Sequence, residues 1–209
     1  NRIEANTAST YGGGVYMTYS QPGLTNDVVA GNHSAYLGSG LYVDHSSPQL
    51  RHTTIARNTG GNGSGLHAAY SSAATLRSAI VTDQATGIFV ANGCSANLDG
   101  VLWFGNQANT GGPGTVVIQH AANGDPAFAA DGYHLSLGSA GIDAGIDASV
   151  TIDIEGDPRP LCFAPDLGAD ELPPALPVAA FTSSSPDWLG QTTTFTNTTA
   201  AVCAAYLWD

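Results

Sequence analysis

A short phrase of alternating aliphatic and other residues returns along the first part of the chain. It reads GGGVYM at Gly12–Met17, GSGLYV at Gly38–Val43 and GSGLHA at Gly63–Ala68. The alternation has a period of two, which is typical of a β-strand with one face toward a core. Glycine before each strand indicates a tight bend, because glycine adopts backbone conformations closed to other residues. The pattern predicts short strands separated by bends.

The phrase belongs to a longer repeat of 26 residues, which shortens to 22 in its last copy. Such a unit, with strands and no helical period, cannot bury a core alone, but stacked coils can. Equivalent residues then lie about 4.8 Å apart, one above another. We therefore predict an all-β fold, a right-handed parallel β-helix. Its expected columns are Leu24, Leu50, Leu76 and Leu98; Ile3, Val29, Ile55, Val81 and Trp103; and the amides Asn6, Asn32, Asn58, Gln84 and Asn106.

Charge is scarce and mostly negative. Charged residues are 11% of the chain, against about 25% in typical proteins, and five arginines face 17 carboxylates, for a net charge of −12. Nucleic acid is not expected as a partner, because phosphate binding needs a basic stripe. No apolar run approaches the roughly 18 residues of a membrane span, so membrane insertion is not expected either. The composition is typical of a secreted β-protein, which predicts an extracellular or cell-surface location.

The three cysteines, Cys94, Cys162 and Cys203, lie far apart and form no CxxC pair. A zinc site built on them is not expected. Two arrangements remain open: one disulfide plus one thiol whose partner lies outside this chain, or three unpaired buried thiols. Nor does the spacing of the histidines match a known metal site, so no metal site is predicted.

Two phrases near the end of the repeats carry a family resemblance. They are DPAFAADGYHLSLGSAGIDAG, which begins at Asp125, and DIEGDPRPLCFAPDLGADE, which ends at Glu171. They resemble the end of pectate-lyase-like β-helices in bacterial surface proteins of the choice-of-anchor type. The repeats themselves resemble the coils of polymorphic outer-membrane proteins. The resemblance implies an exported bacterial protein whose solenoid ends near Glu171.

The last part of the chain has a different character. Its Phe181, the run TFTNTT and the phrase Tyr206–Asp209 are similar to the first half of a polycystic-kidney-disease (PKD) type domain, an immunoglobulin-like sandwich. The family continues with further strands, so the resemblance implies that the sandwich is incomplete here. We expect a β-helix at 1–171, a proline-rich linker at 172–177 and part of a PKD-like domain at 178–209. We interpret the chain as a fragment or a mature form.

Catalytic residues are not predicted. A glycoside hydrolase needs two carboxyl groups about 5 to 10 Å apart, which here requires acids at equivalent positions of neighbouring coils. The acids of the repeats do not align in this way; they are Glu4, Asp27, Asp44, Asp83 and Asp99. A structural or adhesive role is favoured. The first alternative is a polysaccharide lyase or glycoside hydrolase whose catalytic coils lie partly outside these residues. The second alternative is a subunit of an extracellular assembly.

Charged residues form one expected column, of Thr25, Arg51, Arg77 and Asp99. Two stacked arginines repel each other, and Asp99 would relieve Arg77. The pair Arg51 and Arg77 is a candidate site for an anion or a uronate, and a solvated ladder of little energetic value is the other interpretation. Arg57 and Asp83, also 26 residues apart, are expected to form an ion pair.

Rings form another column, one residue after the inward aliphatic position. Its members are Tyr16, Tyr42, His67 and Phe89. We expect these rings to point outward from one sheet, where exposed flat rings would suit a carbohydrate platform. Stacking between strands explains the same pattern without a ligand. The predicted partners are accordingly either a polysaccharide or other proteins at the cell surface or outside the cell. Self-assembly of the chain is a further alternative.

Ten of the 17 acids fall between Asp125 and Glu171. Calcium would suit such an oxygen-rich segment, although DIEGD lacks the full pattern of an EF-hand loop. No other cofactor is expected.

Overall fold

The structure, a computed structural model, describes residues 1–173, 180–184 and 188–198. The chain divides into two compact units, Asn1–Leu172 and Pro173–Asp209. The regular elements of the described residues are all strands. None of these residues forms a helix of the length and hydrophobicity that a membrane span requires.

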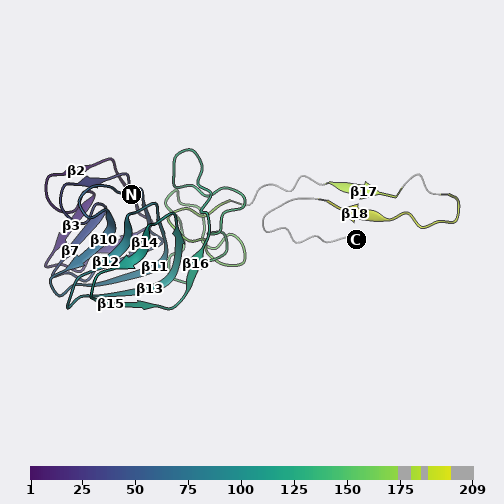
Figure 1. Ribbon diagram of the computed structural model, residues 1–209. Helices are drawn as coiled ribbons and strands as arrows, with labels where there is room; N and C mark the ends of the chain where they lie inside the picture. The colour runs from purple at the N-terminus through teal and green to yellow at the C-terminus, as the bar shows by residue number, and fades with distance from the viewer. Residues whose placement is uncertain (174–179, 185–187, 199–209) are drawn as a thin grey trace. The chain divides into compact units, whose positions relative to one another are not determined.

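The first unit is a parallel β-solenoid with two main sheets (Figure 1). The nine-stranded sheet contains β1 (Arg2–Glu4), β4 (Gly23–Thr25), β5 (Val28–Ala30), β8 (Gln49–Arg51), β9 (Thr54–Ala56), β11 (Ala73–Thr82), β13 (Ser95–Phe104), β15 (Thr115–Ile118) and β16 (Ala121–Asn123). The five-stranded sheet contains β3 (Val15–Thr18), β7 (Leu41–Asp44), β10 (Ser64–Ala69), β12 (Thr86–Val90) and β14 (Ala108–Gly111). A small third sheet pairs β2 (Thr7–Ala8) with β6 (His33–Ser34).

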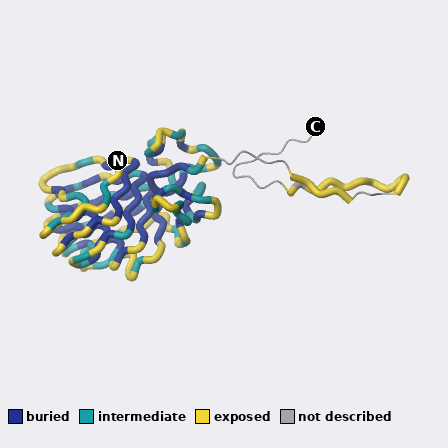
Figure 2. The backbone as a smooth tube through the Cα atoms, turned by 90° about the horizontal axis from the view of Figure 1, so that it is seen from above, coloured by how far each residue is buried: buried dark blue, intermediate teal, exposed yellow. Residues whose placement is uncertain are grey.

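The register of the strands confirms the predicted repeat. Leu24 pairs with Leu50, Leu50 with Leu76 and Leu76 with Leu98. The aliphatic column from Ile3 to Trp103 is paired in the same way. Both columns contribute to one core cluster inside the solenoid. Figure 2 shows that the strands of the solenoid are largely buried and that many of its bends are exposed. Residues one repeat apart in the sequence are therefore paired on neighbouring strands of the sheet.

The predicted amide column lies at a bend, and its first three members are linked from coil to coil by hydrogen bonds. The backbone and side-chain nitrogens of Asn6 both donate to Oδ1 of Asn32, at 3.0 Å. Asn32 repeats the pair of bonds to Oδ1 of Asn58. Because Asn32 and Asn58 are almost fully buried, these bonds satisfy polar groups that would otherwise be costly inside the protein.

The glycines of the opening phrase form bends, as predicted. Gly12, Gly38 and Gly63 have φ of +62°, +65° and +62°, in the left-handed region where glycine carries little strain. Gly40 has a different function, since a Cβ atom there would lie 2.4 Å from the carbonyl oxygen of Gly65 in the next coil. The phrase therefore combines a bend with close contact between coils.

The segment 125–172, here called the closing segment, packs along the outer side of the nine-stranded sheet. Outward residues of β5, β9, β11 and β13 contact its apolar side chains. The two clusters contain Val28, Ala30, Ala56, Tyr133 and Ala169, and Ile80, Leu102, Leu135 and Leu167. The sequence led us to expect a closing segment within residues 1–171, and the structure adds that it lies along the side of the coils. It covers the side of the stack, because alternate residues of these strands are apolar on the outer face as well.

Buried carboxylates hold the loops of the closing segment. Oδ1 of Asp153 accepts hydrogen bonds from the backbone nitrogens of residues 155, 156 and 157, at 2.8 to 2.9 Å. Arg159 donates to Oε2 of Glu171 at 2.8 Å, and both side chains are almost fully buried. Glu171 also accepts hydrogen bonds from the backbone nitrogens of Leu161 and Asp166. Many acids that suggested a calcium site therefore bind the backbone of their own segment.

One predicted ion pair is wrong. The guanidinium of Arg57 donates to the carbonyl oxygen of Gly132, at 3.0 Å, and lies over the ring of Phe128. Asp83 instead accepts a hydrogen bond from the hydroxyl of Thr82. The repeat brings the backbones of the two residues to equivalent bends, but the long arginine side chain reaches the closing segment, which lies outside the repeat.

A column of small polar residues at another bend was not predicted. The backbone nitrogen of Ser20 donates to the hydroxyl of Ser46, that of Ser46 to the hydroxyl of Ser72, and that of Ser72 to the sulfur of Cys94. Cys94 is buried and has a free thiol. It occupies the last place of a serine ladder, which gives this thiol a structural role.

The second unit contains one antiparallel pair, β17 (Phe181–Ser183) and β18 (Phe195–Asn197). The rings of Phe181 and Phe195 contact each other edge to face, with centroids 5.7 Å apart. Most of the predicted linker, and the phrase Tyr206–Asp209, lie outside the described residues.

Candidate functional site

The predicted column of rings is present on the five-stranded sheet. Parallel pairing of β3, β7, β10 and β12 aligns the four residues. Ring centroids are 5.5 Å apart between Tyr16 and Tyr42, 5.4 Å between Tyr42 and His67, and 4.6 Å between His67 and Phe89. The interplanar angles of 14° to 20° describe stacked rings. The repeat therefore produces a continuous aromatic stack across four strands.

The expected exposure of this column is wrong at its centre. Tyr42 and His67 are only 2% and 5% exposed, whereas Tyr16 is 49% exposed. The ring of Tyr11 stacks on Tyr42, with centroids 4.6 Å apart. Nδ2 of Asn62 lies 2.8 Å from Nδ1 of His67. Loops before the strands thus cover the middle of the stack, and its main contribution there is packing.

A second column of rings lies at the bend after the same strands. Tyr19, His45 and Tyr70 stack with centroids 4.7 and 5.6 Å apart and angles of 11° and 3°. Tyr19 and Tyr70 are 78% and 59% exposed. All three residues have φ between +44° and +50°, so the bend turns their rings away from the strand they follow. Their spacing of 26 and 25 residues was the signal that could have revealed this column.

A hollow of about 250 Å³ lies between the two columns. Its lining contains rings from both columns and one carboxylate: Tyr11, Tyr16, Tyr19, Tyr42, Asp44, His45 and Tyr70. Asp44 ends β7, and therefore lies where the strand column passes into the bend column. The hydroxyl of Tyr16 donates to Oδ2 of Asp44 at 2.9 Å, and Nδ1 of His45 lies 2.6 Å from Oδ1. Asp44 is thus held in place among aromatic faces.

Two phenols of the hollow, those of Tyr16 and Tyr42, have raised pKa values. The hydrogen bond to Asp44 raises the pKa of Tyr16 above its ordinary value. Burial raises the pKa of Tyr42, because the phenolate would lose its hydration. Neither phenol is therefore prepared to act as a base near neutral pH. The hollow offers ring faces, hydroxyl groups and one carboxylate.

A pair of catalytic carboxylates is not found in the hollow. Among the residues that the structure describes, Asp44 is the one acid in the lining. A glycosidase needs two carboxyl groups about 5 to 10 Å apart.

The two candidate arginines lie on the other sheet, as part of β8 and β11. The predicted column is present, since Arg51 pairs with Thr25 and Arg77, and Arg77 with Asp99. Arg51 donates to Oε1 of Gln49 at 2.8 Å. Arg77 donates to the carbonyl oxygen of Asp147 at 3.2 Å and lies 3.9 Å from a carboxylate oxygen of Asp99. The structure does not bring these arginines to the rings, and an anion site there stays a prediction.

A comparison with protein families supports the solenoid. A family model described as "Right handed beta helix region" matches residues 1–102, which include both ring columns. No curated protein and no solved structure matches the chain. With parallel pairing throughout the stacked coils, the chain is an all-β protein built on a right-handed parallel β-helix.

Proposed function

We propose that this protein is an extracellular or cell-surface β-helix that binds a neutral carbohydrate in the hollow around Asp44. The observation that carries the proposal is the position of this carboxylate between two stacked columns of rings. The exposed rings of Tyr19 and Tyr70 widen the aromatic surface beyond the partly covered first column. The role is adhesive or structural, with polysaccharide as the preferred partner.

The chemistry of the hollow is complementary to a sugar ring. Tyrosine offers an apolar face for the C–H groups of a pyranose and a hydroxyl at its edge. A carboxylate accepts hydrogen bonds from two neighbouring sugar hydroxyls. The volume of about 250 Å³ is below the roughly 300 to 1,000 Å³ of pockets for drug-sized ligands. It therefore suits one sugar ring, with the rest of the chain lying across the exposed rings.

The charge of the site favours neutral over acidic polysaccharides. Asp44 lies at its centre, and the whole chain has a net charge of −12. A uronate carboxylate would approach the carboxylate of Asp44 with no arginine beside it, since the arginine column lies on the other sheet. Electrostatic repulsion of this kind lowers affinity most at low ionic strength.

The export and the domain organisation are part of the same proposal. Support for export comes from the low content of charged residues and from the resemblance of the closing segment to those of bacterial surface proteins. Support for a PKD-like beginning at 178–209 comes from the antiparallel pair β17 and β18 and the contact between Phe181 and Phe195. The solenoid would then present the hollow at a cell surface.

Affinity electrophoresis in gels with a neutral glucan, mannan or galactan tests the proposal, with polygalacturonate as the acidic comparison. We expect at least one neutral polysaccharide to retard the protein, and Tyr19→Ala, Tyr70→Ala and Asp44→Asn each to reduce the retardation. Phe163→Ala is the control, because Phe163 is 86% exposed and does not line the hollow.

Four results would count against the proposal. Equal loss with the control variant would place binding elsewhere, and stronger retardation by polygalacturonate would favour the arginine column. Release of reducing ends that disappears in Asp44→Asn would show an enzyme of the hydrolase class. Sedimentation of the protein alone as a large oligomer, with no retardation in any gel, would favour the assembly subunit.

A further inference from the structure

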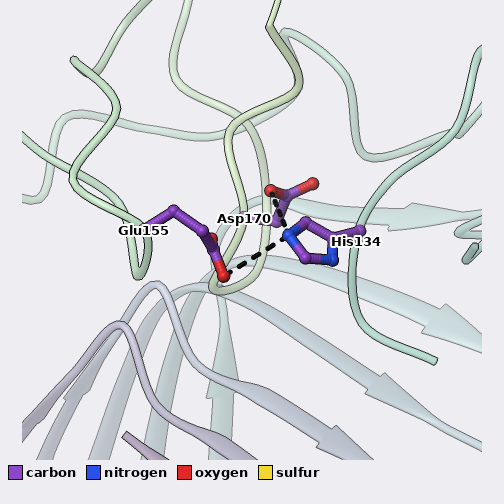
Figure 3. Close-up of side chains that lie close together, drawn as sticks. All are labelled: His134, Glu155 and Asp170. Carbon is purple, nitrogen blue, oxygen red and sulfur yellow. Dashed lines mark ion pairs between the residues drawn. The ribbon is translucent and has the colours of Figure 1, made fainter. Parts of the chain in front are cut away.

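Three side chains of the closing segment meet at one point, away from the aromatic hollow (Figure 3). Nε2 of His134 lies 3.3 Å from Oε1 of Glu155 and 3.9 Å from Oδ1 of Asp170. One nitrogen or oxygen atom from each of the three side chains lies within 4.8 Å of the others. The residues come from different loops, so the fold of the whole segment brings them together.

Neighbouring groups orient all three side chains toward this point. Asp131 bonds Nδ1 of His134, which leaves Nε2 facing the two carboxylates. The hydroxyl of Tyr133 donates to Oε1 of Glu155 at 2.8 Å. The backbone nitrogen of Leu135 donates to Oδ2 of Asp170 at 2.6 Å, and Oδ1 of this 3% exposed side chain faces His134. In a metal-binding histidine, the ring nitrogen that does not bind the metal usually donates a hydrogen bond to a group such as a carboxylate, which orients the ring.

The distances are compatible with ligands of one metal ion. At 3.9 Å, Nε2 of His134 and Oδ1 of Asp170 are too far apart for a hydrogen bond. Ligands at the usual 2.0 to 2.2 Å from a tetrahedral zinc ion lie roughly 3.4 Å from one another. The observed separations of 3.3 and 3.9 Å are close to this value.

We propose that His134, Glu155 and Asp170 form a binding site for Zn²⁺ that links three loops of the closing segment. An imidazole nitrogen with two carboxylates suits zinc, whereas calcium prefers a shell of six to eight oxygens. The side chains of His134 and Glu155 are 36% and 33% exposed, so the ion has a path from solvent and room for a water as fourth ligand. The sequence did not predict this site, because its ligands follow no metal-binding spacing.

The test uses the full chain after treatment with a chelator and dialysis. Titration calorimetry with ZnCl₂ at neutral pH should give one equivalent bound, and zinc should raise the thermal unfolding temperature. CaCl₂ at the same concentration should do neither. No bound zinc, or equal effects of the two ions, would overturn the proposal.

Variants locate the ion. His134→Ala and Glu155→Gln should abolish the binding of one equivalent, and Asp131→Asn should weaken it about tenfold or more, as loss of such a support typically does. His120→Ala is the matched control: Nδ1 of His120 lies 2.6 Å from a carboxylate oxygen of Asp99. The ring nitrogen of His134 contacts Asp131 in a similar way, but no third ligand joins His120 and Asp99 among the residues that the structure describes. Loss of binding in the control, or unchanged binding in Glu155→Gln, would place the zinc elsewhere. Glu155→Gln keeps this test valid if His134→Ala does not fold.

Discussion

The hydroxyl of Tyr16 lies 2.9 Å from a carboxylate oxygen of Asp44, although 28 residues separate them in the sequence. The first residue belongs to the exposed end of the strand column of rings, and the second ends the neighbouring strand β7. This one hydrogen bond joins two coils and also fixes the polar centre of the hollow.

Replacement of Asp44 by asparagine should lower the pKa of Tyr16. The hydrogen bond to the carboxylate raises this pKa, and a neutral amide no longer penalises the phenolate in the same way. An NMR titration with ring-labelled tyrosine measures the change directly. Asp83→Asn, at the bend after β11, is the control and should leave the Tyr16 resonance unaffected. An unchanged pKa in Asp44→Asn would mean that the bond is absent in solution.

Replacement of Tyr42 by alanine should destabilise the solenoid far more than replacement of Tyr19. Tyr42 is 2% exposed and Tyr19 is 78% exposed. Loss of a large buried ring typically costs about 3 to 5 kcal/mol, whereas surface substitutions mostly change stability by about 0.5 kcal/mol or less. Urea unfolding followed by circular dichroism gives both values. Similar losses in the two variants would contradict the division into a packing column and a binding column.

Replacement of His67 by phenylalanine should remove a loss of stability at acid pH. Burial lowers the pKa of His67 to about 4 from 6.5, so between these values the unfolded chain binds a proton that the folded protein does not. The free energy of unfolding of the wild type therefore falls as the pH falls through this window. Relative to the variant, the wild type should lose about 3 kcal/mol between about pH 7 and about pH 4.

Denaturant unfolding at several pH values measures this difference. Asp166 and Asp170, whose pKa values burial raises to about 6, act in the opposite direction, but both proteins keep them and their effect cancels in the comparison. His120→Phe, at a side chain that is 74% exposed, is the surface control. If the control changes the pH profile as much as His67→Phe, the loss does not come from the buried ring.

Replacement of Glu171 by glutamine should unfold or strongly weaken the closing segment. The pair Arg159 and Glu171 is almost fully buried, and a variant that leaves one charge of a buried pair uncompensated typically loses about 3 to 5 kcal/mol. Glu4→Gln breaks the surface pair with Arg2 and should have little effect. Thermal unfolding of both variants, compared with the wild type, checks the contrast. A stable Glu171→Gln would mean that the pair is not essential.

Features that depend on the period of the repeat could be predicted from the sequence. Stacking converts a spacing of 26 residues into pairing, so the positions of Leu50, Asn32 and Tyr42 followed from counting. The column of Tyr19 and Tyr70 obeys the same rule and was open to the same reasoning.

Features that depend on irregular loops could not be predicted in this way. The cover of Tyr42 by Tyr11 depends on how a loop folds back over the sheet. The partner of Arg57 lies in the closing segment, at Gly132. The meeting of His134 with Glu155 and Asp170 depends on three loops of different length. No period relates these residues, so only their packing in three dimensions determines their contacts.

The closing segment also fixes the number of coils between its outermost contacts with the nine-stranded sheet. A repeat stack can in general lengthen by duplication of a unit, because each unit contacts only its neighbours. Here one continuous segment contacts Val28 in one coil and Leu102 three coils further on. An inserted coil between them would move these contacts apart by about 4.8 Å. Duplication of a coil between these contacts would therefore require a closing segment that is longer by the same distance.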